Sequence, residues 1–96
     1  MDVNQSETAV HIIVHGHVQG VGFRSFVQIR ALPLEIAGWV RNCADGTVEI
    51  WAEGPRNKLE RLAQQVQKGP HHGSVDRLDI DWQQPKNLLR GFHIRW

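Results

Sequence analysis

Hydrophobic and polar residues alternate along several short stretches of this 96-residue chain, and a period of two residues is typical of a β-strand with one buried face. The clearest stretch covers residues 9–18, where Val10, Ile12 and Val14 fall on one side. The pattern predicts strands over residues 9–18, 38–42, 47–53, 75–82 and 91–96. Asp45-Gly46 predicts a tight hairpin turn between the second strand and the third.

Two further segments carry apolar residues at intervals of three and four, which is the period of an α-helix. The first runs from Phe23 to about Leu34, and Pro33 is expected to strain or end it because proline lacks a backbone N–H. The second follows Gly54-Pro55 and ends at Gly69-Pro70. Its apolar stripe consists of Leu59, Leu62, Ala63 and Val66.

This order of elements predicts an α+β fold of the ferredoxin-like βαββαβ type, a sandwich of one antiparallel sheet with both helices on one face. The length suits one domain, which we place at residues 8–96. Residues 1–7 are polar and unpatterned, so we expect them to form a flexible N-terminal tail.

The composition excludes several classes of function. Eleven Lys and Arg residues against ten Asp and Glu give a net charge of +1, far from the strongly basic balance of most nucleic-acid-binding domains. The longest apolar run, Ile12–Val14, is too short to span a membrane, and no secretory signal is apparent. The single cysteine, Cys43, excludes an internal disulfide and favours the cytoplasm. We expect a monomer with no nucleic-acid or membrane partner.

The segment Gly16–Gly22 holds three glycines in seven residues, which predicts a loop with unusual backbone angles. Such a loop turns its N–H groups inward to bind an anion, and the helix predicted to begin near Phe23 adds the positive end of its dipole. Arg24 would be unfavourable in that first turn unless an anion lay beside it, and its guanidinium can grip two phosphate oxygens. The alternative is a tight turn with a surface arginine.

Three familiar phosphate motifs do not fit. A Walker loop requires Gly-Lys-Ser/Thr where this chain has Gly22-Phe23-Arg24. The dinucleotide fingerprint fits only partly at Ser25, and it belongs to parallel sheets in longer chains. A cysteine phosphatase needs an arginine six residues after its nucleophile, where Cys43 is followed by Glu49.

Three segments, His15–Arg24, Gly38–Asn42 and Asp45–Glu49, together resemble the acylphosphatase family. The resemblance extends from about Val10 to Arg95. It implies a ferredoxin-like enzyme that hydrolyses a small-molecule acyl phosphate to a carboxylate and inorganic phosphate, without a cofactor or metal.

The same resemblance implies that Arg24 and Asn42 are the catalytic residues. The backbone amides that would hold the phosphate are those of Gln19, Gly20, Val21, Gly22, Phe23 and Arg24. Asn42, with a donor and an acceptor, suits the orientation of the attacking water, especially if its strand neighbours the first one. Its alternative role is to cap the hairpin turn. The family usually has a glycine where this chain has Glu35, so the first helix should end early at a cost of about 1 kcal/mol.

Other functions remain as alternatives. A non-catalytic phosphate-binding module, or a domain that handles carbamoyl phosphate, fits the same scaffold. The six histidines suggest a metal site, but no cysteine or paired carboxylate joins them at ligand spacing. An RNA-binding domain would need paired aromatic residues on its sheet and a basic excess.

Overall fold

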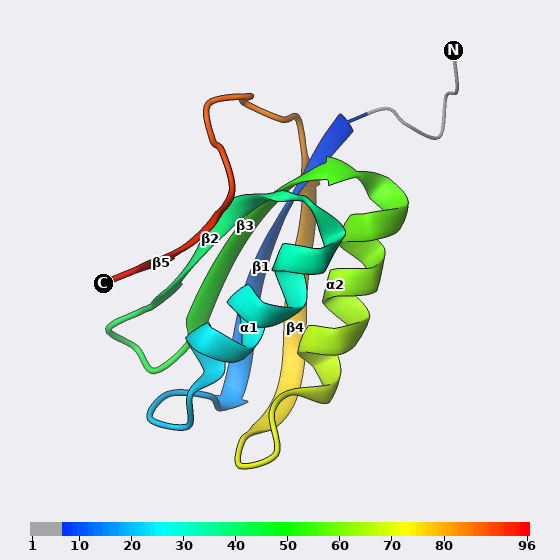
Figure 1. Cartoon of the computed structure of the whole chain (residues 1–96). Coiled ribbons are helices and arrows are strands. Elements are labelled where there is room, and N and C mark those ends of the chain that lie inside the picture. Colours follow the sequence, from blue (N-terminus) through cyan, green and yellow to red (C-terminus); the bar gives the residue numbers. More distant parts are fainter. Residues whose placement is uncertain (1–6) are drawn as a thin grey trace.

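The computed structural model describes residues 7–96, which form a five-stranded sheet with two α-helices packed on one of its faces (Figure 1). Of the predicted tail, only Glu7 lies within the described residues, where it begins the first strand. The elements in chain order are β1 (Glu7–His17), α1 (Phe23–Ala31), the 3-10 helix η2 (Leu32–Leu34), β2 (Ala37–Asn42), β3 (Val48–Pro55), α2 (Arg56–Lys68), β4 (Ser74–Gln83) and β5 (Phe92–Arg95). The predicted fold class is confirmed.

The strand order is β4-β1-β3-β2-β5, and every neighbouring pair is antiparallel except β2 and β5. The sheet is therefore mixed, where the sequence pattern predicted an antiparallel one. The strand predicted over residues 91–96 is present as β5, but it is one element more than the predicted βαββαβ order contains. Residues 84–91 carry the chain from β4 past three strands to the far edge, where β5 runs parallel to β2.

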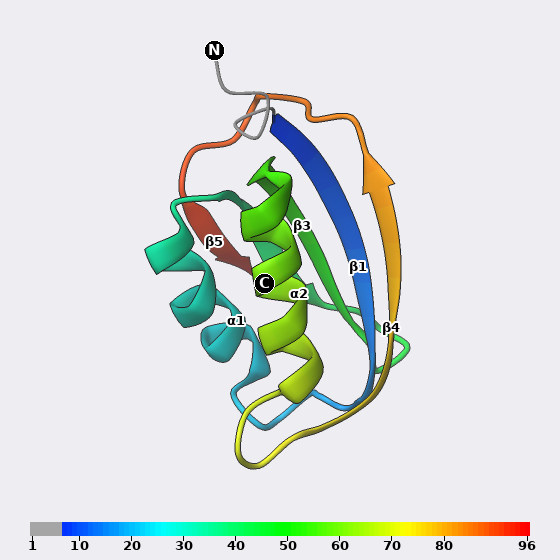
Figure 2. The ribbon, with the colours of Figure 1, turned by 90° about the vertical axis from the view of Figure 1, so that its right-hand side faces the viewer.

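The core lies between the sheet and the helices, which Figure 2 shows together on one side. Val10, Ile12 and Val14 of β1 are fully buried, as their alternation predicted. The α2 stripe that includes Leu59 and Val66 packs against them in the same cluster. Burial of these aliphatic side chains contributes roughly 1.5–3 kcal/mol each, so the two periodic patterns account for much of the fold's stability. No helix in the described range is long and apolar enough to cross a membrane.

The first helix ends early, as expected. Regular α-helix stops at Ala31, and Pro33 lies in the 3-10 turn that follows. Glu35 then has φ 56° and ψ 38°, the left-handed conformation that a side chain disfavours. Its N–H donates to the Leu32 carbonyl, so the turn is closed as a glycine would close it.

Replacing Glu35 by glycine is expected to raise the free energy of unfolding by about 0.5–1 kcal/mol, because the left-handed strain removed exceeds the added flexibility of the unfolded chain. Urea denaturation measures the change. The control is Glu35→Ala, which removes the carboxylate but keeps the Cβ atom and should not gain stability. An equal gain in both variants would show that charge, and not backbone strain, sets the cost.

Glu53 fixes the connection that brings β5 to its place. Although it lies on the sheet face away from the helices, it is only 4% exposed, because residues 84–91 cover it. Its carboxylate accepts hydrogen bonds from Trp51 Nε1 at 2.7 Å, the Asn87 N–H at 3.0 Å and the Lys86 N–H at 3.2 Å. Burial, the strongest influence, raises the pKa of this carboxyl, but the hydrogen bonds together bring the pKa below its ordinary value.

A carboxyl with a lowered pKa in the folded state stabilises the protein above its unfolded pKa, and the contribution is lost as the pH falls through the folded pKa. We therefore expect Glu53→Gln to have a lower free energy of unfolding than wild type at pH 7. The difference between the two free energies should shrink once the pH drops below 4.5, the ordinary pKa of a glutamate. Urea denaturation of both proteins between neutral and acidic pH measures it. A difference that stays constant down to the acid limit would contradict this account.

Candidate active site

The loop between β1 and α1 is anchored at both ends by buried side chains and is exposed between them. Val18 and Phe23 are 1% and 2% exposed and belong to the core. Gly20 and Gly22 both have φ 75°, a conformation that favours glycine, and both are exposed. The unusual backbone angles predicted for this segment are therefore present, and they leave a loop of backbone without bulky side chains at the two glycines.

This loop presents free hydrogen-bond donors. Within residues 7–96, the N–H groups of Gln19 to Gly22 donate to no backbone carbonyl. The first turn of α1 adds further unpaired N–H groups and the positive end of the helix dipole. That turn contains no acidic residue, and Gly22 supplies no side-chain cap. Donors and partial positive charge thus gather at one corner of the molecule, an environment suited to an anion.

Arg24 lies in the same first turn, where the helix dipole disfavours a cation. Its Nη1 donates to the Arg95 carbonyl at 3.2 Å, and its guanidinium carbon lies 4.1 Å from the centre of the Trp96 ring. These neutral contacts orient the guanidinium without cancelling its charge. Among the residues that the structure describes, no carboxylate forms an ion pair with Arg24. Its charge therefore remains available to a ligand.

A cavity of about 120 Å³ brings Arg24 and Asn42 together. The lining residues are Val18, Gly20, Gly22, Phe23, Arg24, Ser25, Asn42, Ile94 and Trp96. Pockets for drug-sized ligands measure roughly 300–1,000 Å³, so this one suits a small anion with the rest of a ligand left outside. Of the predicted loop residues, Gln19 and Val21 do not line the cavity.

Asn42 reaches this cavity although its strand does not neighbour β1. It ends β2 and pairs with Val48 of β3, which lies between β1 and β2. The loop that follows β1 lies close to the hairpin turn after β2, because the Gln19 side chain bonds carbonyls of that turn. Gln19 Nε2 donates to the Cys43 and Thr47 carbonyls, both at 2.8 Å. The Asn42 amide itself is half-buried.

Sequence reasoning missed four contributions to the site. Ile94 of β5 and Trp96, directly after β5, line the cavity, and the Arg95 carbonyl accepts a hydrogen bond from Arg24. The alternation in the last strand predicted that Ile94 and Trp96 share one side, but it did not predict which strand would pair with that segment. The side-chain hydrogen bonds of Gln19 were likewise invisible, because their acceptors lie 24 and 28 residues away.

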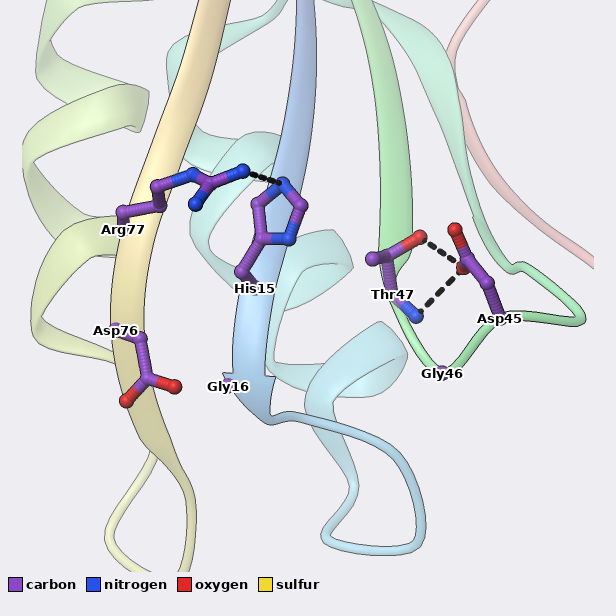
Figure 3. A pocket seen from close by; sticks show the side chains of 7 residues that line it. All are labelled: His15, Gly16, Asp45, Gly46, Thr47, Asp76 and Arg77. Atoms are coloured by element: carbon purple, nitrogen blue, oxygen red, sulfur yellow. Dashed lines mark hydrogen bonds between the residues drawn. The ribbon is translucent and has the colours of Figure 1, made fainter.

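A second, shallower cavity lies on the open face of the sheet and is lined by His15, Asp45, Thr47, Asp76, Arg77 and two glycines (Figure 3). Its charges are mixed: Asp45 and Asp76 bring two carboxylates, whereas His15 Nε2 and Arg77 Nε lie 2.8 and 3.1 Å from the carboxylate of Asp79, which does not line the cavity. The cavity therefore offers no single sign of charge. Within residues 7–96, no three His, Cys, Asp or Glu side chains gather as metal ligands would.

The fold and the cavity define a class of protein: a small ferredoxin-like domain whose loop, helix start and Arg24 suit a phosphate group. The acylphosphatase family model matches residues 10–94. An acylphosphatase of Salinibacter ruber is 43% identical over 90 residues, which cover 94% of this chain and 95% of that protein. The chain belongs to the acylphosphatase family.

Solved structures agree with that assignment. The acylphosphatase of Bacillus subtilis superposes with a TM-score of 0.89 at 40% identity, covering 93% of this chain and 99% of that one. Full-length HypF, solved in a phosphate- and nucleotide-bound form, superposes at 0.84 with 25% identity. That match covers 96% of this chain but 12% of HypF, so the same domain also occurs within a much longer protein.

Proposed function

We propose that this acylphosphatase binds the phosphate of its acyl phosphate substrate in the cavity between the glycine loop and Asn42, with Arg24 as the main cationic ligand. The observation that carries this proposal is the Arg24 guanidinium, which is oriented by neutral groups and has no carboxylate partner among the described residues. Further donors come from the start of α1 and from the loop, where the N–H groups of Gly20 and Gly22, two residues that line the cavity, donate to no backbone carbonyl of the described residues.

The chemistry needs little beyond positioning and charge stabilisation. Water attacks the phosphorus atom, the bond from phosphorus to the acyl oxygen breaks, and the leaving group departs as a carboxylate. A carboxylate is a weak base at neutral pH, so no general acid is required to protonate it. Negative charge on the equatorial oxygens of the loose transition state is stabilised by Arg24 and the loop amides.

Asn42 completes this arrangement by orienting the water. It lines the cavity with Arg24 and carries both a donor and an acceptor, so it can hold a water molecule in line with the scissile bond. The proton that the water loses passes to an oxygen of the substrate phosphate. The products are one carboxylic acid anion and one inorganic phosphate.

We further propose that the enzyme acts as a monomer in the cytoplasm, without metal or cofactor. Arg24 and the backbone donors supply the positive charge that a metal ion provides in many phosphoryl-transfer sites. Cys43 is a free thiol, in keeping with a reducing compartment. Light scattering during gel filtration would report the oligomeric state.

Hydrolysis of benzoyl phosphate in the presence of a chelator tests the proposal directly. We expect turnover that survives the chelator and collapses in Arg24→Ala and Asn42→Ala. A wild-type protein that binds inorganic phosphate but turns over no acyl phosphate would favour a binding module instead. Hydrolysis confined to carbamoyl phosphate would favour the role of a carbamoyl-phosphate-handling domain.

A further inference from the structure

The Gln19 side chain joins the two halves of the site. Both N–H groups of its amide have partners, because Nε2 donates to the Cys43 carbonyl and to the Thr47 carbonyl, each at 2.8 Å. Both bonds are partly buried, where a hydrogen bond is protected from competing water. No other hydrogen bond within residues 7–96 joins the loop of residues 18–22 to the turn of residues 43–47.

The turn that Gln19 contacts is closed by its own hydrogen bonds. The Cys43 N–H donates to the Thr47 carbonyl at 2.9 Å, which closes the hairpin. Asp45 Oδ1 accepts from the Thr47 N–H at 3.0 Å and from the Thr47 hydroxyl at 2.6 Å, two bonds that Figure 3 shows. Asn42 directly precedes this closed turn, so any displacement of the turn relative to the loop displaces Asn42 with it.

Apart from the Gln19 amide, apolar packing holds the loop within the described residues: Val18 belongs to the core and Val21 packs against it. These contacts fix the loop to the core, whereas the two Gln19 hydrogen bonds join it to the turn. We propose that Gln19 is a positioning residue whose side chain sets the distance between the phosphate-binding loop and Asn42. This inference rests on the proposed role of Asn42 in orienting water. Gln19 would then control the rate of the chemical step and not the affinity for phosphate.

Replacing Gln19 by methionine, which has a similar length but no donor, tests this inference. We expect kcat for benzoyl phosphate to fall roughly 10- to 100-fold, since a small misplacement of a reacting group costs about that much. The inhibition constant of inorganic phosphate should stay within about twofold, because the loop amides and Arg24 are untouched.

The decisive measurement is a double-mutant cycle with Asn42→Ala. If Gln19 acts through Asn42, the Gln19→Met change should lower kcat by less than about threefold once Asn42 is already alanine. An equal loss in both backgrounds would overturn the inference, as would a loss confined to phosphate affinity. Full activity of Asn42→Ala alone would instead overturn the proposed role of Asn42, so the two failures are distinguishable.

Gln28→Met is the matched control. Gln28 also uses a side-chain amide to reach a distant carbonyl, donating to Phe92 at 2.9 Å, but it does not line the cavity. We expect this variant to lose stability without a selective loss of kcat. If Gln19→Met does not fold, Gln19→Asn keeps the amide but is one methylene too short to reach both carbonyls. It should show the same coupling to Asn42 with a smaller loss of kcat.

Discussion

Arg24→Ala is expected to lose both turnover and phosphate binding. Loss of one contact that stabilises transition-state charge typically lowers kcat by about 100- to 1,000-fold. A hydrogen bond to a charged group contributes about 1.5–3 kcal/mol, so the affinity for inorganic phosphate should fall by roughly 10- to 100-fold as well. Steady-state kinetics with benzoyl phosphate and competitive inhibition by phosphate measure the two effects separately.

The same substitution should leave stability almost unchanged. It removes a cation from the start of α1, where the dipole disfavours it, and sacrifices the contacts with Arg95 and Trp96. These opposing effects are each small, so the free energy of unfolding should stay within about 0.5 kcal/mol of wild type. Activity lost together with several kcal/mol of stability would mean that Arg24 is mainly structural.

Two further variants test whether the position and the planar shape of the Arg24 guanidinium matter. Arg30→Ala removes a cation from the last turn of the same helix, where it lies over the Phe26 ring and not in the cavity, and should retain activity. Arg24→Lys keeps the charge but loses the planar pair of donors, so it should recover only part of the phosphate affinity. Full recovery by lysine would show that a point charge is sufficient.

The parts of the fold that sequence predicted are those fixed by local periodicity. Burial of one face imposes a period of two on β1 and three to four on α2, so Val14 and Leu62 could be assigned to the core without coordinates. Pro33 likewise predicted the early end of α1, because proline has no backbone N–H and its effect on a helix is confined to about one turn.

The parallel pairing of β5 could not be predicted in this way. The alternation of its residues shows that it is a strand but not which strand it joins. Its place is set by residues 84–91 and by the carboxylate of Glu53, which binds the backbone of that connection from 33 and 34 residues away. From the strand pattern alone, a glutamate that faces away from the helices is expected to be exposed to solvent. Its burial becomes evident only when the position of the segment that covers it is known.

The site likewise has parts that the sequence predicts and parts that depend on the fold. Arg24 and the glycine loop are contiguous in sequence, so their common chemistry is visible as a motif. The approach of Ile94 and Trp96 to Arg24 depends on where β5 lies, and the reach of Gln19 to Cys43 depends on how two loops pack. Chemistry carried by neighbouring residues was predictable, whereas the contacts that position it come from the assembled sheet.

Asn42→Ala is expected to separate turnover from binding. If Asn42 orients the attacking water, its loss should lower kcat by about 100- to 1,000-fold. The inhibition constant of inorganic phosphate should change by less than about threefold, because the phosphate ligands remain. The contrast with Arg24→Ala, which loses both, is the kinetic signature of two different roles in one cavity.

The competing interpretation gives Asn42 a role only in the turn that follows it. In that case Asn42→Ala would cost about 1 kcal/mol of stability and leave kcat intact. Asn42→Asp keeps the shape and acceptors but adds a negative charge beside the bound phosphate, so it should weaken phosphate binding as well as turnover. A third possibility is that Asn42 is itself a ligand of the phosphate. In that case Asn42→Ala would already lose phosphate affinity.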